Sequence, residues 1–296
     1  MSERDATPFT RADQDPMIPH VMLAPIIHRA LAEDLEGGDL TTEATIDGTT
    51  LAVAHARARN EIVVCGGDVF RAVFHAIDPS LHVSLDAPEG KRVVRGDSLW
   101  TVKGSARSIL MGERTALNFV QRMTGIATLS RHYVEAIPAG CRTRVTDTRK
   151  TTPGLRVLER YAVRTGGAHN HRDTLGSAVL IKDNHIVAAG GIRIAVERAR
   201  RRAPHTSRIE VEVESLAALD EALDAGAEIV LLDNFAPADI EEAVRIAKSR
   251  ALIEVSGGVT LERIATLARA GVDIISVGAL THSAPAADIG LDFEPS

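Results

Sequence analysis

The sequence predicts an α/β protein in two parts, in which a mixed α/β domain with an antiparallel sheet precedes an α/β barrel. Two observations support this fold class. Residues 51–110 contain strand-like runs separated by turn-forming residues, whereas from about Cys141 onward short apolar runs alternate with helical segments. Repeated βα units of the second kind are typical of parallel strands joined by right-handed crossovers.

The first part contains both helices and strands. Apolar residues recur at helical spacing over 19–34, and residues 51–59 alternate as a strand does. Residues 61–77 predict a strand, a glycine turn and a helix, and 81–110 predict hairpins because three Gly-containing turns interrupt them. A long helical stretch follows over 112–137.

The second part contains six βα units. Strands are expected at 143–148, 178–184, 209–215, 228–234, 252–258 and 272–278, and the helices include 191–202, 216–226, 236–250 and 260–271. The alternative to a barrel is an open doubly wound sheet. We favour the barrel because almost every strand ends in a polar group, which suits a site built at strand C-termini around a ring. Six units fall short of eight, and the pattern does not locate the missing strands.

Composition argues against several classes of function. The 296 residues are 45% hydrophobic and 25% charged, and a net charge of −6 argues against a nucleic-acid binder. No apolar run approaches the roughly 18 residues of a membrane helix. Residues 1–17 are polar, lack a signal-peptide core, and are expected to be a flexible tail. Cys65 and Cys141 form no metal-ligand pattern, which favours a reducing cytoplasm.

Positive charge is concentrated in one segment of this acidic chain. Residues 142–185 hold seven Arg and two Lys against four acids, a net charge of +5. Arg156, Arg160 and Arg164 have helical spacing, which predicts a solvated helix face. The remaining candidates lie at strand or loop ends: Arg149, Lys150, His171, Arg172 and Lys182. An isolated Arg-Lys pair is usually a solvated loop, but cations clustered at a barrel mouth predict a ligand with several negative groups.

Acidic residues and glycines follow the later strands. Glu212 and Asp233 are candidates for a pair that holds Mg²⁺, which commonly uses one or two carboxylates together with substrate phosphates. Alternatively, Glu210, Glu212 and Glu214 only solvate a strand edge or pair with nearby Arg. The Gly-rich segments 255–259 and 276–280 accompany the last two strands, where barrels commonly bind phosphate through backbone N–H groups.

Several segments, in order along the chain, resemble the quinolinate phosphoribosyltransferase (decarboxylating nicotinate-nucleotide pyrophosphorylase) family. They are TDTRKTTPGLR, GGAHNHR, LIKDNH, EVEVES, LLDNF, SGGV and VGALTHS, and EDLEGGDLTTEA and GERTALNFVQRMTGIAT resemble its N-terminal domain. The resemblance covers nearly all of the chain after residue 18. His169 and Thr152 depart from the pattern, because apolar residues are expected there, but neither departure changes a charged position.

The resemblance implies an α/β sandwich domain beside an incomplete, seven-stranded α/β barrel. We expect the sandwich over 18–128 and the barrel over 129–282, with 283–296 able to pack back on the sandwich. It also implies a homodimer, open to further assembly, in which the N-terminal domain of one subunit caps the barrel of the other.

The implied reaction joins quinolinate and phosphoribosyl pyrophosphate into nicotinate mononucleotide, pyrophosphate and CO₂, a step of NAD biosynthesis. By resemblance, Arg149, His171, Arg172 and Lys182 bind quinolinate, with Arg114 from the partner subunit. Glu212 and Asp233 stabilise the ribosyl transition state and hold Mg²⁺, and Lys150 neutralises pyrophosphate. The remaining substrate-binding residues are Thr148 and the 5′-phosphate site formed by Ser256, Gly257, Gly258, Val277, Gly278 and Ala279.

Three other functions are weighed. A paralogue of the same fold would act on another acceptor, as the molybdenum-transport-associated relatives do, but the Arg-Arg-His-Lys set for two carboxylates is complete here. A Schiff-base aldolase would use Lys182 or Lys150, yet both lie in polar sequence rather than the apolar surroundings that depress a lysine pKa. A non-enzymatic lipoyl- or biotin-carrier is suggested by residues 89–104, although Lys91 precedes a strand instead of lying at a hairpin tip.

Overall fold

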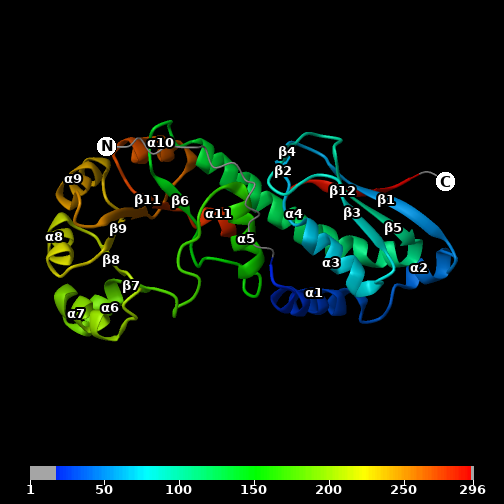
Figure 1. Ribbon diagram of the computed structural model, residues 1–296, viewed down its shortest axis with the longest axis horizontal. Coiled ribbons are helices and arrows are strands. Elements are labelled where there is room, and N and C mark those ends of the chain that lie inside the picture. The colour runs from blue at the N-terminus through cyan, green and yellow to red at the C-terminus, as the bar shows by residue number, and fades with distance from the viewer. Residues whose placement is uncertain (1–17, 295–296) are drawn as a thin grey trace, which may run out of the picture.

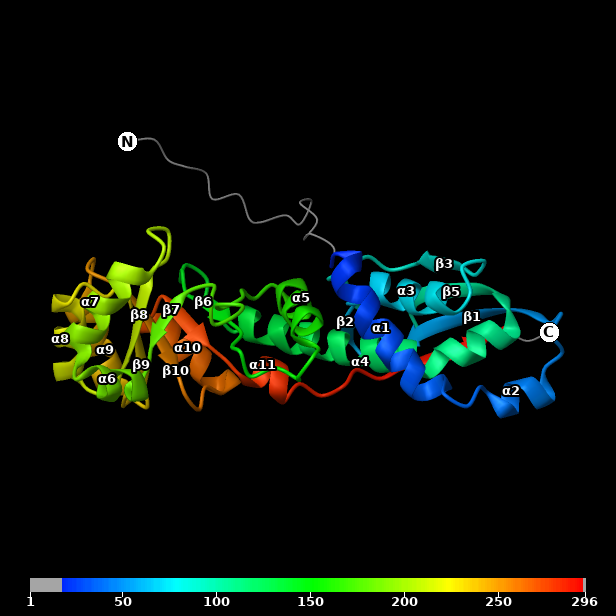
Figure 2. The ribbon, with the colours of Figure 1, turned by 90° about the horizontal axis from the view of Figure 1, so that it is seen from below.

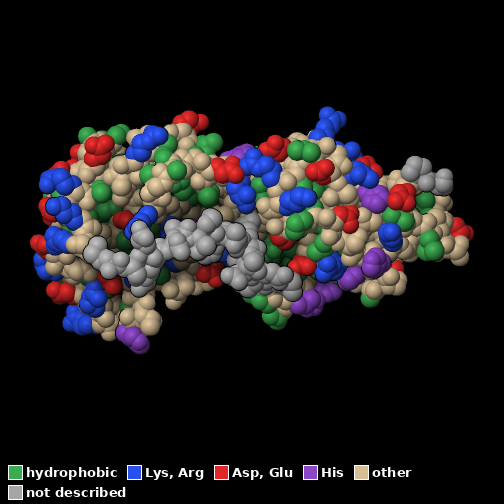
Figure 3. All heavy atoms as spheres, turned by 45° about the horizontal axis from the view of Figure 1, so that its top comes forward, with side chains coloured by type: hydrophobic (Ala, Val, Ile, Leu, Met, Phe, Trp, Pro, Cys, Tyr) green, Lys and Arg blue, Asp and Glu red, His purple; other side chains and the backbone are tan. Residues whose placement is uncertain are grey.

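The computed structural model describes residues 18–294, so the tail expected at 1–17 lies outside the described residues. The chain forms two lobes along one long axis, with the N-terminal elements at one end and the parallel sheet at the other (Figures 1 and 2). No helix of the described residues is long and apolar enough to cross a membrane. On the face shown in Figure 3, side chains of both charges are interspersed over the two lobes.

The N-terminal lobe is built on a four-stranded antiparallel sheet in the order β12–β1–β5–β3. Its strands are β1 (Leu51–Ala58), β3 (His82–Leu85), β5 (Ser98–Ser105) and β12 (Ile289–Phe293), and β2 (Ile62–Val63) pairs separately with β4 (Arg92–Val93). The helices are α1 (His20–Leu35), α2 (Leu40–Thr45) and α3 (Gly67–Ile77). Trp100, Phe70 and Phe74 are fully buried and pack together in the core of this lobe.

Helix α4 (Ala106–Glu135) has 30 residues and runs from the N-terminal lobe into the barrel lobe (Figure 2). The C-terminal segment crosses it on the way back to β1. Gly125 makes this crossing possible, because a Cβ there would lie 1.9 Å from the carbonyl oxygen of Pro285. Gly166 of α5 allows a second close approach, since its Cβ would lie 2.5 Å from the carbonyl oxygen of Ala127.

The second lobe contains a six-stranded parallel sheet in the order β6–β11–β10–β9–β8–β7. Its strands are β6 (Arg144–Thr146), β7 (Val179–Ile181), β8 (Ile209–Val213), β9 (Ile229–Asp233), β10 (Leu252–Ser256) and β11 (Ile274–Ser276). Helices α5 (Arg156–Gly166), α6 (Asp183–Ala189), α7 (Ile192–Arg202), α8 (Leu216–Asp224), α9 (Pro237–Ala247), α10 (Leu261–Arg269) and α11 (Ala279–His282) connect them. All six strands expected from the apolar runs are present, most of them shorter at their ends.

The curved sheet is an incomplete barrel. Beside the free edge of β6, His169 forms a single parallel bridge to Thr146, with its N–H donating to the carbonyl of Val145 at 2.8 Å. One residue pair therefore stands where a further strand would lie, which explains why the apolar pattern predicted only six. The segment 170–178 then reaches β7 as loop, without closing the ring.

Candidate active site

The loops that follow the parallel strands meet at one rim of the barrel. Lys150, after β6, lies beside Gly278, after β11: a Cβ on this glycine would be 3.1 Å from Cδ of the lysine. The carbonyl of Lys150 accepts a hydrogen bond from the Thr281 hydroxyl at 2.8 Å, and its N–H donates to the Thr148 hydroxyl at 3.1 Å. The strand order therefore brings the 148–150 and 277–279 segments together, although they are far apart in sequence.

The glycine segment after β10 contacts the end of β9. Ser256 pairs in register with Asp233, and a Cβ on Gly257 would lie 2.9 Å from Oδ1 of that aspartate. Gly257 and Gly258 have φ angles of 83° and 55°, a left-handed backbone that favours glycine. Asp233 also accepts a hydrogen bond from the side chain of Asn234 at 2.9 Å.

Lys182 and Glu212 form an ion pair across neighbouring strands. Lys182 follows β7 and its Nζ donates to the carboxylate of Glu212, which lies in β8. The glutamate side chain is 14% exposed and the lysine side chain 44% exposed, so the pair faces the mouth of the barrel rather than its core. Each group can therefore exchange its partner for a ligand without unfolding the sheet.

Two arginines form the cationic side of the rim. The Nε atom of Arg149 is buried and has no hydrogen-bond partner among the described residues. Arg172 donates to the carbonyl of Ala178 at 3.2 Å. Burial lowers the pKa of the Arg172 guanidinium, and the charge of Arg149 lowers it further, which places the two cations close together. An anionic ligand would relieve this repulsion.

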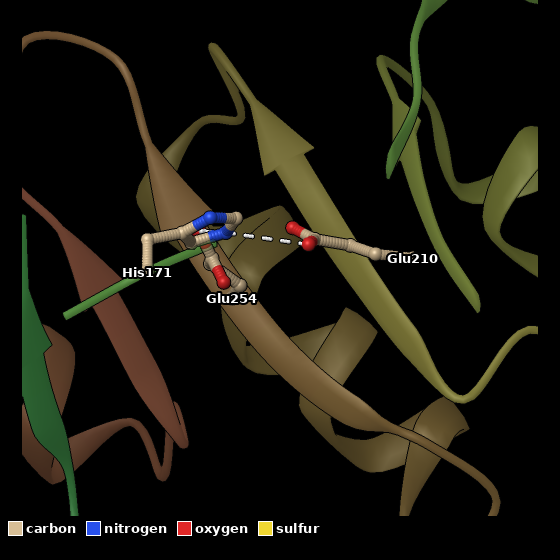
Figure 4. A group of neighbouring side chains, drawn as sticks. All are labelled: His171, Glu210 and Glu254. Carbon is tan, nitrogen blue, oxygen red and sulfur yellow. Dashed lines mark ion pairs between the residues drawn. The ribbon is translucent and has the colours of Figure 1, made fainter. Parts of the chain in front are cut away.

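His171 lies over two carboxylates in the interior of the sheet (Figure 4). Its Nε2 is 3.3 Å from Glu210 Oε2 and 3.4 Å from Glu254 Oε1, and its Nδ1 accepts the N–H of Arg172 at 2.8 Å. Burial lowers the pKa of His171, and hydrogen bonds to the two carboxylates raise it. The bond from Arg172 acts against the carboxylates, because Nδ1 can accept an N–H only while the ring is neutral and carries its proton on Nε2.

The prediction of a solvated face for Arg160 is wrong. The arginine is 8% exposed and pairs with Asp147, which is fully buried, at 3.4 Å. Its guanidinium donates to the carbonyls of His171 at 2.6 Å and Arg172 at 3.2 Å. Helical spacing alone missed this role because α5 packs against α4 on one side and the 170–173 loop covers its polar side.

Within the described part of the chain, Arg114 lies away from this rim. It lies in α4 and lines a cavity of about 400 Å³ bordered by α1, α4 and the loop 153–155. The same cavity is lined by Arg122, which donates to the buried Glu159 at 2.7 Å and to the Thr152 hydroxyl at 2.7 Å. Thr152, a departure from the family pattern, thus has polar partners here.

Sequence reasoning did not single out Asp147, Arg160 or Glu254. The signal for Glu254 was present, because one acid stands among the apolar residues of the run LIEVS. A bare carboxylate inside a sheet is costly, so its position predicts a buried cationic or hydrogen-bonding partner. Burial also raises the pKa of Asp147, against the opposing charge of Arg160, as expected for a carboxylate enclosed by protein.

Comparison with known proteins assigns the family. Models of the N- and C-terminal domains of quinolinate phosphoribosyl transferase match residues 39–124 and 126–292. The nicotinate-nucleotide pyrophosphorylase (carboxylating) of Mycobacterium leprae is 44% identical over 273 residues, 90% of this chain and 95% of that protein. The human protein of that name is 40% identical over 279 residues, 93% of each chain. The crystal structure of NadC from Streptococcus pyogenes aligns with a TM-score of 0.90 and 39% identity, covering 95% of this chain and 100% of that one. The chain therefore belongs to the quinolinate phosphoribosyl transferase family.

Proposed function

We propose that this protein transfers the phosphoribosyl group of phosphoribosyl pyrophosphate to quinolinate, with decarboxylation, to give nicotinate mononucleotide, pyrophosphate and CO₂. The observation that carries the proposal is the arrangement of the rim. Arg149 and Arg172 lie close together, Lys182 pairs with Glu212, and Asp233 lies beside the glycine segment that follows β10. One mouth thus offers sites for a dicarboxylate and for a phosphorylated sugar.

The arginines of the rim would bind the acceptor substrate, quinolinate. Quinolinate carries two adjacent carboxylates, and a guanidinium binds a carboxylate through two parallel N–H donors. Arg149 has a buried Nε without a partner, and Arg172 uses one NH group on Ala178, so both retain donors for the acceptor. His171 has protein partners at both ring nitrogens, so a direct bond from its ring to quinolinate requires one of them to be released.

Glu212 and Asp233 fit a magnesium ion. They are oxygen donors at the ends of the paired strands β8 and β9, and Mg²⁺ takes one or two carboxylates together with substrate phosphates. When bound, the ion would supply charge neutralisation for pyrophosphate as it leaves. Glu212 would first release Lys182, which frees this ammonium group for the acceptor.

The remaining residues serve the donor. The 5′-phosphate would lie on the main chain of Ser256–Gly258 and Val277–Ala279, whose backbone N–H groups suit an anion. Lys150 is exposed next to Gly278 and can neutralise the departing pyrophosphate. After the ring nitrogen is alkylated, its positive charge stabilises the electron pair that the departing CO₂ leaves on C2, and a proton from water then adds at C2, so decarboxylation needs no further cofactor.

We further propose a homodimer with composite sites in the cytoplasm. Arg114 would complete the acceptor pocket of the partner, and Val21 and Met22 of α1 leave 78% and 49% of their surfaces exposed near its cavity, as an interface residue does in a free subunit. Among the described residues, Cys65 and Cys141 form no disulfide, which suits a reducing compartment.

A single assay tests the proposed reaction. Purified protein is mixed with Mg²⁺, phosphoribosyl pyrophosphate and quinolinate, and nicotinate mononucleotide and CO₂ are measured. Nicotinate and other pyridine carboxylates serve as alternative acceptors in parallel reactions. The proposal fails if nicotinate mononucleotide does not form from quinolinate, and preferred turnover of another acceptor would identify a paralogous activity instead.

A further inference from the structure

Glu254 is a buried carboxylate in the middle of β10 and is only 1% exposed. It accepts a hydrogen bond from the Ser276 hydroxyl, and Ser276 in turn lies 2.8 Å from the Thr146 hydroxyl. These three residues come from β10, β11 and β6, three adjacent strands of the sheet. The carboxylate is therefore held rigidly from one side, and its other neighbour is the imidazole of His171 at 3.4 Å.

A contribution to folding stability does not explain why the Glu254 carboxylate lies inside the sheet. Replacing a buried ion pair by well-packed apolar residues is often neutral or stabilising, so a carboxylate in a sheet interior is weak support for folding. The group it contacts, in contrast, belongs to the candidate active site. His171 lies next to Arg172, in a segment that forms no strand and must be held by side chains.

The main chain of residues 171–172 is held at four points. Asp147 accepts the N–H of His171 at 2.8 Å, and Arg160 donates to the carbonyls of His171 and Arg172. The fourth contact is the N–H of Arg172, which donates to Nδ1 of His171 at 2.8 Å. This last bond needs a fixed ring, and the ring is fixed by the carboxylates at Nε2 (Figure 4).

We propose that Glu254 is a positioning residue of the acceptor site, which fixes the imidazole of His171 from the barrel interior and thereby fixes the main chain that presents Arg172. This inference rests on the proposed function. Glu254 is a better probe than Glu210, because Glu210 shares β8 with Glu212 and its replacement would disturb that residue as well. The bond at Nε2 also sets which ring nitrogen is free to accept from Arg172.

The test compares two variants with the parent. Glu254→Gln keeps the shape and an oxygen that accepts from Ser276, but removes the charge that faces His171. We expect its KM for quinolinate to rise at least tenfold, while KM for phosphoribosyl pyrophosphate stays within twofold. Ser276→Ala leaves the charge and removes only its anchor, so we expect a smaller rise of about threefold to tenfold for quinolinate. This second variant tests the proposal even if Glu254→Gln does not fold.

Nuclear magnetic resonance of ¹⁵N-histidine-labelled protein supplies a reading that does not depend on turnover. In the parent, the proton on Nε2 of His171 should be protected from exchange with water, and in Glu254→Gln it should exchange at least tenfold faster. His171→Asn assigns the signal. Asp86→Asn is the matched control: Asp86 accepts the hydroxyl groups of Ser98 and Thr101 at 2.8 and 2.6 Å within the N-terminal lobe, so its change should alter neither KM nor the His171 signal.

The outcomes separate the two proposals. If the parent does not convert quinolinate, the proposed function fails, while the exchange measurement still tests the link from Glu254 to His171. If the parent converts quinolinate and Glu254→Gln keeps both its KM and a protected Nε2 proton, the positioning role is wrong. Equal increases in KM for both substrates would also overturn it, because general loss of structure has no preference for one substrate.

Discussion

Adding one methyl group at Gly257 should damage the donor site far more than adding one at Gly258. Both residues have a left-handed backbone, with φ angles of 83° and 55°, which costs an L-residue about 1–2 kcal/mol. The surroundings differ. A Cβ at Gly257 would lie 2.9 Å from Asp233 Oδ1 and 3.2 Å from Asn234 Oδ1, whereas a Cβ at Gly258 has no heavy atom within 4 Å.

The expected magnitudes follow from this difference. Gly257→Ala and Gly258→Ala should each lower the free energy of unfolding by about 1–2 kcal/mol, because both share the backbone term. Only Gly257→Ala must also displace the Asp233 carboxylate. A misplacement on the order of 1 Å in an active site can cost about 100-fold in rate. We therefore expect kcat/KM for phosphoribosyl pyrophosphate to fall about 10- to 100-fold in Gly257→Ala and only a few-fold in Gly258→Ala.

Urea unfolding and steady-state kinetics measure the two effects separately. Phosphoribosyl pyrophosphate is varied at saturating quinolinate, and the Mg²⁺ concentration for half-maximal activity is recorded for each variant. This concentration should rise in Gly257→Ala, since a displaced Asp233 holds the ion less well. Matching losses of activity in the two variants would refute the reasoning, because they would show that contact with Asp233 does not matter.

Four further predictions concern the acceptor site, its specificity, the assembly and the metal. Arg172→Ala removes one partner of a buried charge-assisted contact, so it should weaken the use of quinolinate by about 2–5 kcal/mol with little effect on phosphoribosyl pyrophosphate; equal effects on both would contradict this. Nicotinate lacks the 2-carboxylate and would leave buried cations unpaired, so its turnover should be very low beside that of quinolinate. Inactive Arg114→Ala and Lys182→Ala proteins, mixed under conditions of subunit exchange, should regain about a quarter of the parent activity, because about half the dimers carry one intact site. No recovery after demonstrated exchange would place Arg114 in its own barrel or in no site. Chelation of Mg²⁺ by EDTA should stop turnover, and added Mg²⁺ should restore it.

The periodic parts of the chain could be predicted from sequence, and the irregular parts could not. The six parallel strands could be predicted because short segments rich in Val, Ile and Leu recur between helical segments. The sequence did not predict the bridge beside β6, because a single bridging residue, His169, shows no hydrophobic periodicity. Strand ends were predicted too long, since residues after a strand, such as Asn234 after β9 and Gly257 after β10, adopt a left-handed backbone instead of continuing the ladder.

The same distinction applies to the candidate site. Residues at strand ends were identified by their charge and position, because parallel strands place their C-terminal ends on one rim. Residues that hold these groups in place were missed. Arg160 looked like one of three solvated arginines on a helix, and only the tertiary structure shows that the 170–173 loop covers it. A pattern within one helix carries no information about the loop that packs on it.

The alternating glutamates of strand β8 lie at two different depths in the barrel. Glu210 and Glu212 lie two residues apart, so their side chains point to the same face and are separated by about 6.6 Å along the strand. The deeper carboxylate is 4% exposed and contacts His171, whereas the next is part-buried and contacts Lys182 at the mouth. Glu214, which follows the end of the strand, is exposed. An alternation first open to interpretation as edge solvation thus divides into an inner carboxylate that contacts His171 and an outer one that contacts Lys182 at the mouth.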